Sequence, residues 1–276
     1  WAKYYVKFIQ AYRAAGVNIR YLTVQNEPEA VQTWDSCEYS AREEAEFIRY
    51  YLSKELHAAG IEDIKVLVWD HNKEGAYRRA KEALATIEKT DLIGGVAVHW
   101  YTGDHFDAIR AVRKAFPDKS IFFTEGCVEF SRFSPSDEIL MAQMYGHDMI
   151  GNFAAGVEAF FDWNLLLDEE GGPNHVNNFC AAPMMLEEGK ATKRLPYYYI
   201  GHFSKFVKPG AKVMMSSTYC KDLEAVAFIN PDGEEVVVLM NPTDHALPAA
   251  IRHNEGGQGV YHVLEPHSIV TVCFTP

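Results

Sequence analysis

Two glutamates, Glu27 and Glu125, each follow a largely apolar segment of the chain. The first comes after YLTVQN and before Pro28, and the second comes after SIFFT and before Gly126. A lone glutamate in such a position is more often a solvated loop residue. Two glutamates that face the same site can hydrolyse a glycosidic bond. One carboxyl group protonates the leaving oxygen, and the other attacks the anomeric carbon or activates water.

Five segments of the chain end in polar or aromatic side chains in this way. They are the near-continuous apolar runs that a strand buried on both faces requires, at residues 17–29, 64–72, 93–103, 120–127 and 157–168. Besides the two glutamates, their ends include Asn26, Asp70, His99, Trp100, Tyr101 and Trp163. Because the carboxyl ends of parallel strands meet on one rim of a barrel, we expect these side chains to line one site.

Amphipathic segments that predict helices alternate with these strands, at residues 1–16, 40–60, 76–90, 105–116 and 135–156. Ser40 and Glu43 have the spacing of a capping box. No glycine-rich phosphate loop follows any strand, which weakens a doubly wound nucleotide-binding sheet. We therefore expect a (β/α)8 TIM barrel, represented here by its last five units, with three more strands preceding Trp1.

The last part of the chain has a different character. Residues 168–183 read as a long polar loop, and a predicted helix follows at 197–207. Six short segments then alternate between turn signals, at residues 212–219, 224–230, 234–241, 246–253, 259–266 and 268–274. They predict an antiparallel β-sandwich. The expected domains are a TIM-barrel catalytic part at 1–200 and a β-sandwich part at 201–276.

Composition narrows the functional classes. The 276 residues carry a formal net charge of −12 and a pI of about 5.4, which argues against a nucleic-acid partner. No apolar run is long enough for a membrane span. Five scattered cysteines without a C-x-x-C pair favour thiols in a reducing, cytoplasmic compartment. No metal-ligand spacing is present, so we expect neither a metal nor a cofactor.

Several motifs are specific in combination: LTVQNEPEA, AVHWYTG, FFTEGC, DWNLLLDEEGGPNHVNNF and YYYIGHFSKFVKPGAKV. Together they resemble glycoside hydrolase family 30, above all its glucosylceramidase branch. An N-E-P strand end alone is shared by many retaining barrel glycosidases. The resemblance covers essentially the whole chain, and family members begin well upstream of Trp1, so we expect the N-terminal part to be missing.

The resemblance implies a role for each matching residue. Glu27 matches the general acid/base, and Glu125 matches the nucleophile that forms a glycosyl-enzyme. Asn26 matches the amide that binds the sugar 2-hydroxyl, Tyr101 supports the nucleophile, and Trp163 is the floor under the sugar. The implied substrate-binding residues are Asn26, His99, Trp100, Tyr101, Trp163 and Asn178.

The sequence departs from the resemblance at two positions. Gly126 stands where relatives often have alanine, and His175 stands where they have tryptophan, which leaves the leaving-group side of the site open. The implied roles require a raised pKa for Glu27 and an ionised Glu125, helped by a hydrogen bond from Tyr101. Retention of configuration requires the two carboxyl groups to lie about 5–5.5 Å apart.

Alternatives remain at this point. His99 also fits a satisfied core histidine, Trp163 fits core packing, and Asp70 fits either a sugar contact or a helix cap. The expected activity is retaining hydrolysis of β-glucosides, with glucosylceramide or another glycolipid or carbohydrate as substrate. The alternatives are the same chemistry on a β-xyloside, a β-fucoside or β-1,6-glucan, and a sugar-binding protein or inactive fragment without catalysis.

Overall fold

The computed structural model describes residues 1–275 except 87–91, 130–133, 135, 172–178 and 253–258. The chain divides into two compact units. The first consists of Trp1–Gly126 and Ala155–Asp162, and the second consists of Cys127–Ala154 and Trp163–Pro276.

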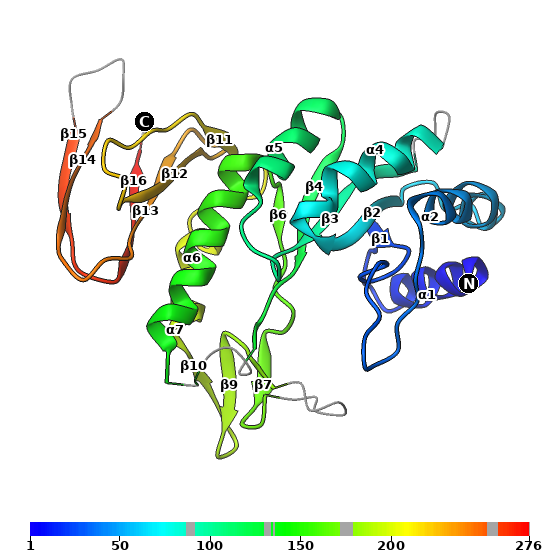
Figure 1. Cartoon of the computed structure of the whole chain (residues 1–276), viewed down its shortest axis with the longest axis horizontal. Helices are drawn as coiled ribbons and strands as arrows, with labels where there is room; N and C mark the ends of the chain where they lie inside the picture. The colour runs from blue at the N-terminus through cyan, green and yellow to red at the C-terminus, as the bar shows by residue number, and fades with distance from the viewer. Residues whose placement is uncertain (87–91, 130–133, 135, 172–178, 253–258, 276) are drawn as a thin grey trace. The chain divides into compact units, whose positions relative to one another are not determined.

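A parallel sheet forms the centre of the first unit (Figure 1). Its order in the described residues is β1-β2-β3-β4-β6, with β1 at Tyr21–Thr23, β2 at Lys65–Asn72, β3 at Ile93–His99, β4 at Ser120–Glu125 and β6 at Ala159–Phe160. Every neighbouring pair in this sheet is parallel. This confirms the predicted run of consecutive barrel strands, which here form half of a barrel.

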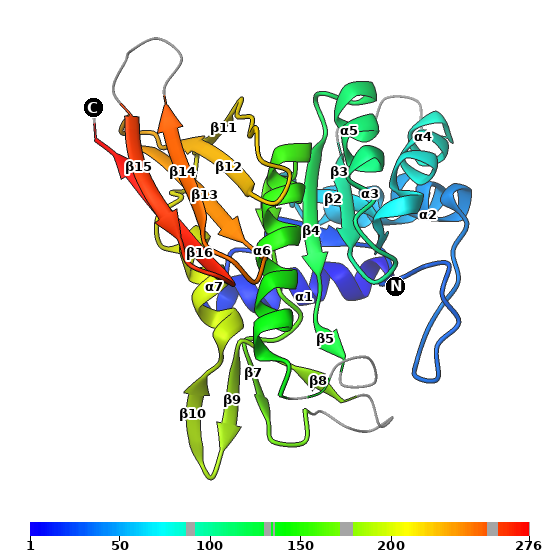
Figure 2. The ribbon, with the colours of Figure 1, turned by 60° about the vertical axis from the view of Figure 1, so that its left-hand side comes forward.

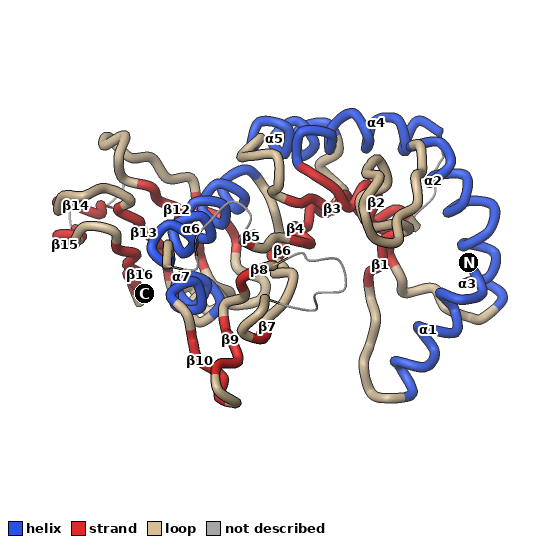
Figure 3. The backbone as a smooth tube through the Cα atoms, turned by 60° about the horizontal axis from the view of Figure 1, so that its bottom comes forward, coloured by secondary structure: helices blue, strands red, loops and turns tan. Residues whose placement is uncertain are grey.

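The helices of the first unit form an outer arc around the curved row of strands β1 to β4 (Figure 3). They are α1 (Ala2–Ala14), α2 (Ala41–Phe47), α3 (Ser53–Ala58), α4 (Ala76–Thr86) and α5 (Phe106–Ala115). The π-helical turn η1 (Ile48–Leu52) joins α2 to α3, and the 3₁₀ turn η2 (Lys73–Gly75) precedes α4. The capping box of Ser40 and Glu43 is confirmed, because each residue's side chain accepts a hydrogen bond from the other's backbone N–H.

Close backbone packing explains one glycine of the sheet. An added Cβ at Gly95 on β3 would lie 2.0 Å from the carbonyl oxygen of Ser120 on β4. Only glycine allows the two strands to pair at this point. The pairing of β3 with β4 stays regular from here to Val98 and shifts register between Val98 and His99, where the site residues begin.

The second unit contains two antiparallel sheets that pack as a sandwich (Figure 2). One sheet has the order β11-β12-β13-β16, and the other pairs β14 with β15. Leu239, Ala249 and Leu264 form a buried cluster between them. The six predicted strands are all present: β11 (Lys212–Met214), β12 (Glu224–Ile229), β13 (Glu235–Asn241), β14 (Leu247–Arg252), β15 (Gly259–Leu264) and β16 (Ser268–Phe274).

Two helices of the second unit pack against this sandwich. They are α6 (Glu138–Ala155) and α7 (Leu195–Ser204). Phe153 of α6 lies 5.8 Å from Phe203 of α7 and 5.5 Å from Phe228 of β12, measured between ring centroids. Aromatic burial thus joins the helices to the sheet.

The predicted long loop at 168–183 is only partly correct. Its end contains the short strand β8 (Cys180–Ala181), which pairs with β5 (Val128–Glu129). An unpredicted hairpin follows, in which β9 (Met184–Glu187) pairs with β10 (Lys190–Lys193), and β7 (Leu166–Asp168) joins β9. Glu188 and Gly189 both have positive φ, 49° and 76°, as a tight hairpin turn requires.

None of the helices in the described ranges combines the length and the apolar character that a bilayer span requires.

Candidate active site

Glu27 lies in a tightly held turn in the segment that follows strand β1, which ends at Thr23. Its φ of 47° is in the left-handed region, which a residue with a side chain adopts only when its surroundings enforce it. Its backbone N–H donates to the carbonyl oxygen of Asp70 at 2.8 Å, and Pro28 fixes the chain after it. The residue is 8% exposed, and its Oε2 atom accepts a hydrogen bond from Nε2 of Gln32 at 2.8 Å.

The end of strand β2 is irregular, and it turns Asp70 inward. The pairing of β2 with β3 shifts register between Trp69 and His71, and both Trp69 and Asp70 have positive φ, 84° and 50°. Such a bulge re-aims a side chain. Asp70 accepts hydrogen bonds from Oγ1 of Thr23 at 2.6 Å and Oγ1 of Thr124 at 2.7 Å. Within the described residues, the partners of the Asp70 carboxylate are thus side chains of the sheet, not a helix N-terminus.

His99 is buried at the end of β3, between two carboxylates. Its Nδ1 atom lies 3.2 Å from Oε1 of Glu27, and its Nε2 atom lies 3.1 Å from Oδ1 of Asp70. With a carboxylate at each nitrogen, the ring has one orientation and donates from both nitrogens when protonated. His99 is therefore a satisfied buried histidine and also the direct partner of the candidate acid/base.

Glu125 ends strand β4 and pairs with His99 in the ladder. The phenol of Tyr101 donates a hydrogen bond to Oε1 of Glu125 at 2.9 Å, as the prediction of a supporting phenol requires. Trp100 is 8% exposed and packs edge-on against Phe123, with ring centroids 5.8 Å apart. Trp100 thus packs beside Glu125, and its part in substrate binding stays a prediction.

The ionisable groups of the site shift one another's pKa. Burial disfavours the charged form of His99, but its hydrogen bonds to Asp70 and Glu27 prevail and raise its pKa to about 9. Burial by itself raises the pKa of Glu27, but the hydrogen bond and charge of His99 bring it below its ordinary value, and the same holds for Asp70. Burial raises the pKa of Glu125 despite His99 and Tyr101, and the charge of Glu27 adds to this rise.

These directions correct the pKa values expected from the sequence. We predicted a raised pKa for Glu27, whereas in the resting protein it is Glu125 that is raised and Glu27 that is lowered. The cause is the positive charge of His99, which lies directly against Glu27. Because the charge of Glu27 raises the pKa of Glu125, the two carboxylates lie within electrostatic reach of each other.

The other predicted site residues lie outside the contacts described above. Asn26 is exposed and adjacent to Glu27. Trp163 belongs to the second unit and is half-buried. Asn178, like His175, lies outside the described residues. The roles of these residues stay predictions.

Sequence reasoning missed His71 as a member of the site. Its Nδ1 atom lies 3.7 Å from Oε1 of Glu27. Gln32, Thr23 and Thr124 were also missed, although they hold the Glu27 and Asp70 carboxylates. The available signal was the polar end of β2, which includes His71, but only the assembled sheet shows which carboxylate it meets.

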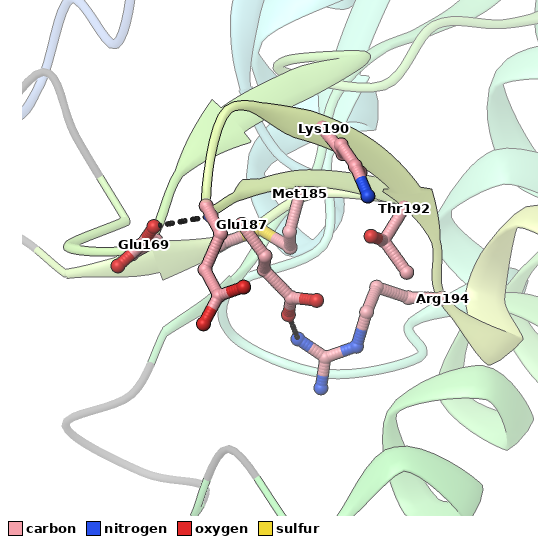
Figure 4. A pocket seen from close by; sticks show the side chains of 7 residues that line it. Glu169, Met185, Glu187, Lys190, Thr192 and Arg194 are labelled. Atoms are coloured by element: carbon pink, nitrogen blue, oxygen red, sulfur yellow. Dashed lines mark hydrogen bonds and ion pairs between the residues drawn. The ribbon is translucent and has the colours of Figure 1, made fainter.

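A surface hollow of about 600 Å³ lies on the second unit along the β9–β10 hairpin (Figure 4). In it the guanidinium of Arg194 pairs with Glu187 at 3.9 Å, and Glu188 N–H donates to Glu169 at 2.7 Å. The lining residues are Glu169, Met185, Glu187, Glu188, Lys190, Thr192 and Arg194. None of the predicted catalytic or binding residues that the structure describes lines it, so the strand ends of the first unit remain the candidate site.

Comparison with known families agrees with this geometry. Residues 1–207 match the glycosyl hydrolase family 30 TIM-barrel domain, and residues 210–272 match the glycosyl hydrolase family 30 beta sandwich domain. The chain belongs to glycosyl hydrolase family 30. It is therefore a member of a family of glycoside hydrolases, and its half-barrel and sandwich are parts of the two domains of that family.

Individual relatives cover nearly all of this chain. It is 32% identical to the lysosomal acid glucosylceramidase of Mus musculus over 265 residues, which are 91% of this chain and 51% of that protein. It is 30% identical to the endo-1,6-beta-D-glucanase BGN16.3 of Trichoderma harzianum over 87% of this chain and 49% of that protein. The chain thus spans about half the length of the curated relatives it matches.

The fold has a near match among solved structures. The crystal structure of SrfJ from Salmonella typhimurium superimposes with a TM-score of 0.93 at 40% identity, over 100% of this chain and 62% of that one. The endo-beta1,6-glucanase BT3312 superimposes with a TM-score of 0.87 at 24% identity, which supports the fold alone.

Proposed function

We propose that the protein hydrolyses β-glucosidic bonds by a double displacement, with Glu125 as nucleophile and Glu27 as general acid/base. The observation that supports this most is the linked set of strand-end contacts: Tyr101 to Glu125 at 2.9 Å, and His99 between Glu27 and Asp70 at 3.2 and 3.1 Å. Two carboxylates with separate partners suit separate roles.

In the first step, a carboxylate oxygen of Glu125 attacks the anomeric carbon while the bond to the leaving oxygen breaks. The leaving oxygen takes a proton from Glu27. Because Glu27 is ionised in the resting site and His99 is protonated, this proton comes from Nδ1 of His99 across the 3.2 Å contact to Oε1. Asp70 holds the ring in place during the transfer through Nε2.

In the second step, Glu27 takes a proton from water, and the water oxygen attacks the anomeric carbon and releases Glu125. Glu27 is again a carboxylate after the first step, because it passed its proton to the leaving oxygen, and it returns the proton taken from water to Nδ1 of His99 across the 3.2 Å contact. Glu27 can therefore act as the general base that activates water in the second step. The sugar leaves with its β configuration retained.

For the substrate we favour glucose linked to ceramide or to a similar aglycone, which places the activity in sphingolipid metabolism. The support is the similarity to the mouse lysosomal acid glucosylceramidase. The similarity to an endo-1,6-beta-D-glucanase supports β-1,6-glucan as the second candidate. Activity on a β-xyloside or a β-fucoside uses the same chemistry and is separated from both by a substrate panel.

The remaining residues keep their proposed roles. Asn26 binds the sugar 2-hydroxyl, Trp163 supplies the aromatic floor for the sugar, and Asn178 takes part in substrate binding. We also propose that residues 1–200 contribute the catalytic barrel part and residues 201–276 the sandwich part.

The test is the Glu125→Gln variant of the full-length protein, assayed on an aryl β-glucoside. The proposal expects a loss of turnover by several orders of magnitude with unchanged folding, measured by circular dichroism. Retained turnover removes the nucleophile assignment. If the wild type binds glucosides in calorimetry but turns over no member of a panel with glucosylceramide, β-1,6-glucan and aryl β-xyloside or β-fucoside, the protein is a sugar-binding protein instead.

A further inference from the structure

Three metal-binding side chains that are far apart in the sequence meet beside the candidate acid/base. One ligand atom from each of Glu27, His71 and His99 lies within 4.8 Å of the other two. Oε1 of Glu27 is 3.2 Å from Nδ1 of His99 and 3.7 Å from Nδ1 of His71. Four-coordinate Zn²⁺ with bonds of about 2.0–2.1 Å places neighbouring ligand atoms about 3.4 Å apart, so both separations suit it.

A separate observation concerns His71. Its Nδ1 atom is buried and has no hydrogen-bond partner within the part of the chain that the structure describes. The side chain is 13% exposed, and its ring packs on Trp69 with centroids 4.8 Å apart. A buried ring nitrogen without a hydrogen bond costs free energy, which a bound cation restores.

The surrounding contacts also suit a metal site. Asp70 accepts from Nε2 of His99 at 3.1 Å, which leaves Nδ1 directed at Glu27. Gln32 donates to Oε2 of Glu27 at 2.8 Å, which leaves Oε1 directed at the two histidines. A carboxylate that orients a ligating histidine from its second nitrogen is the usual outer shell of a zinc site.

We propose that Oε1 of Glu27, Nδ1 of His71 and Nδ1 of His99 bind a divalent transition-metal ion of the Zn²⁺ type, with water as fourth ligand. The histidines bind as neutral imidazoles, and any proton on Nδ1 of His99 leaves to solvent. The sequence predicted no metal because these ligands come from three different strand ends, with no fixed spacing. Because the ion would occupy Oε1 of Glu27, it would reversibly inhibit hydrolysis; this consequence rests on the proposed function.

The binding test uses the full-length protein after removal of metals with a chelator. Zn²⁺ is titrated against a chromophoric chelator, and Co²⁺ is added separately as an absorbing probe of four-coordinate geometry. The wild type is expected to bind one Zn²⁺ at this site. His71→Phe, which keeps a ring against Trp69, is expected to lose at least about tenfold in affinity, and Asp70→Asn about 10–100-fold.

The matched control is His57→Gln, because His57 is a surface histidine with a side chain 84% exposed. It is expected to bind Zn²⁺ as the wild type does. A second measurement needs no variant: Zn²⁺ is expected to shift the ring signals of His71 and His99 in nuclear magnetic resonance spectra. Equal affinities for the wild type and His71→Phe, or unshifted ring signals, overturn the proposal.

The metal proposal and the proposed function fail separately. Zn²⁺ binding is measured without substrate. If the protein binds Zn²⁺ but hydrolyses no glycoside, the metal proposal stands and the proposed function fails. If the enzyme is active, its hydrolysis is unaffected by Zn²⁺ and its His71 signals do not shift, the proposed function stands and the metal proposal fails.

Discussion

The Nδ1 atom of His99 lies 3.2 Å from Oε1 of Glu27, and this contact decides where the proton of the site resides. With Asp70 at its other nitrogen, His99 keeps a pKa of about 9, and the pKa of Glu27 falls below its ordinary value. The acid/base of the proposed reaction is therefore a carboxylate and an imidazolium acting together.

The stability of the metal-free protein is expected to depend on pH through His99. Its proton is held more tightly in the folded state, with a pKa of about 9, than in the unfolded state near 6.5. The contribution of His99 to the free energy of unfolding is complete below about pH 6.5 and is lost as pH rises through about 9. It amounts to about 3 kcal/mol at most. Urea denaturation at intervals between pH 6 and 10 measures it.

The control for this prediction is Asp70→Asn, which removes one of the two carboxylates at His99. Its pKa is expected to fall toward the ordinary histidine value, and the slope of stability against pH between 6.5 and 9 becomes shallower. A ring signal of His99 that titrates near 6.5 in the wild type contradicts the assigned contacts.

Tyr101→Phe is expected to lower kcat on an aryl β-glucoside by about 10–100-fold, because a hydrogen bond to a charged group is worth about 1.5–3 kcal/mol. The variant also loses a contact that lowers the pKa of Glu125, so the acidic limb of the kcat/KM profile moves to higher pH. Tyr77→Phe, at an exposed position on α4, serves as control and leaves both unchanged. An unshifted acidic limb in Tyr101→Phe speaks against the support of Glu125.

Gly126→Ala is expected to destabilise the protein by about 1–3 kcal/mol. The added Cβ would lie 2.7 Å from Phe123 and 2.8 Å from Trp100, so one ring must move beside Glu125. Gly201→Ala in helix α7 is the control, because nothing lies within 4 Å of its Cβ, and it stabilises by about 1 kcal/mol. Thermal unfolding of both variants measures this, and equal stability of Gly126→Ala and wild type is the contrary result.

Arg79→Met is expected to cost about 3–5 kcal/mol, because it leaves Glu44 buried beside Trp69 without its charge partner. Arg79 and Glu44 have side chains 0% and 1% exposed with a 3.1 Å ion pair, and Oε1 of Glu44 accepts from the N–H of Trp69 at 3.1 Å. Arg42→Met is the control, because it breaks an exposed ion pair with Glu46 on α2, the helix that carries Glu44. It is expected to leave the urea midpoint unchanged. Similar midpoints for both variants would show that the buried pair does not hold the end of β2.

The regular part of the fold was predictable because local patterns agree with the tertiary structure. Near-continuous apolar runs identified the parallel strands, and turn signals separated the six strands of the sandwich. The capping box at Ser40 needs only residues three apart. The hairpin at 184–193 was missed, although Glu188 and Gly189 make its turn.

The two glutamates were predictable as strand ends, but their electrostatics were not. The inward turn of Asp70 depends on a bulge with positive φ at Trp69, which no local signal announces. The position of His71 against Glu27 depends on the same bulge. The pKa directions follow from these placements, so they could not be read from the sequence.

Covalent trapping with a 2-deoxy-2-fluoro-β-glucoside that has a good leaving group tests directly whether Glu125 is the nucleophile. The fluorine slows hydrolysis of the glycosyl-enzyme, and mass spectrometry of a digest identifies the labelled residue. We expect one added fluoroglucosyl group on Glu125, absent from Glu125→Gln. A label on any other residue, or turnover of β-glucosides without a trapped intermediate, contradicts it.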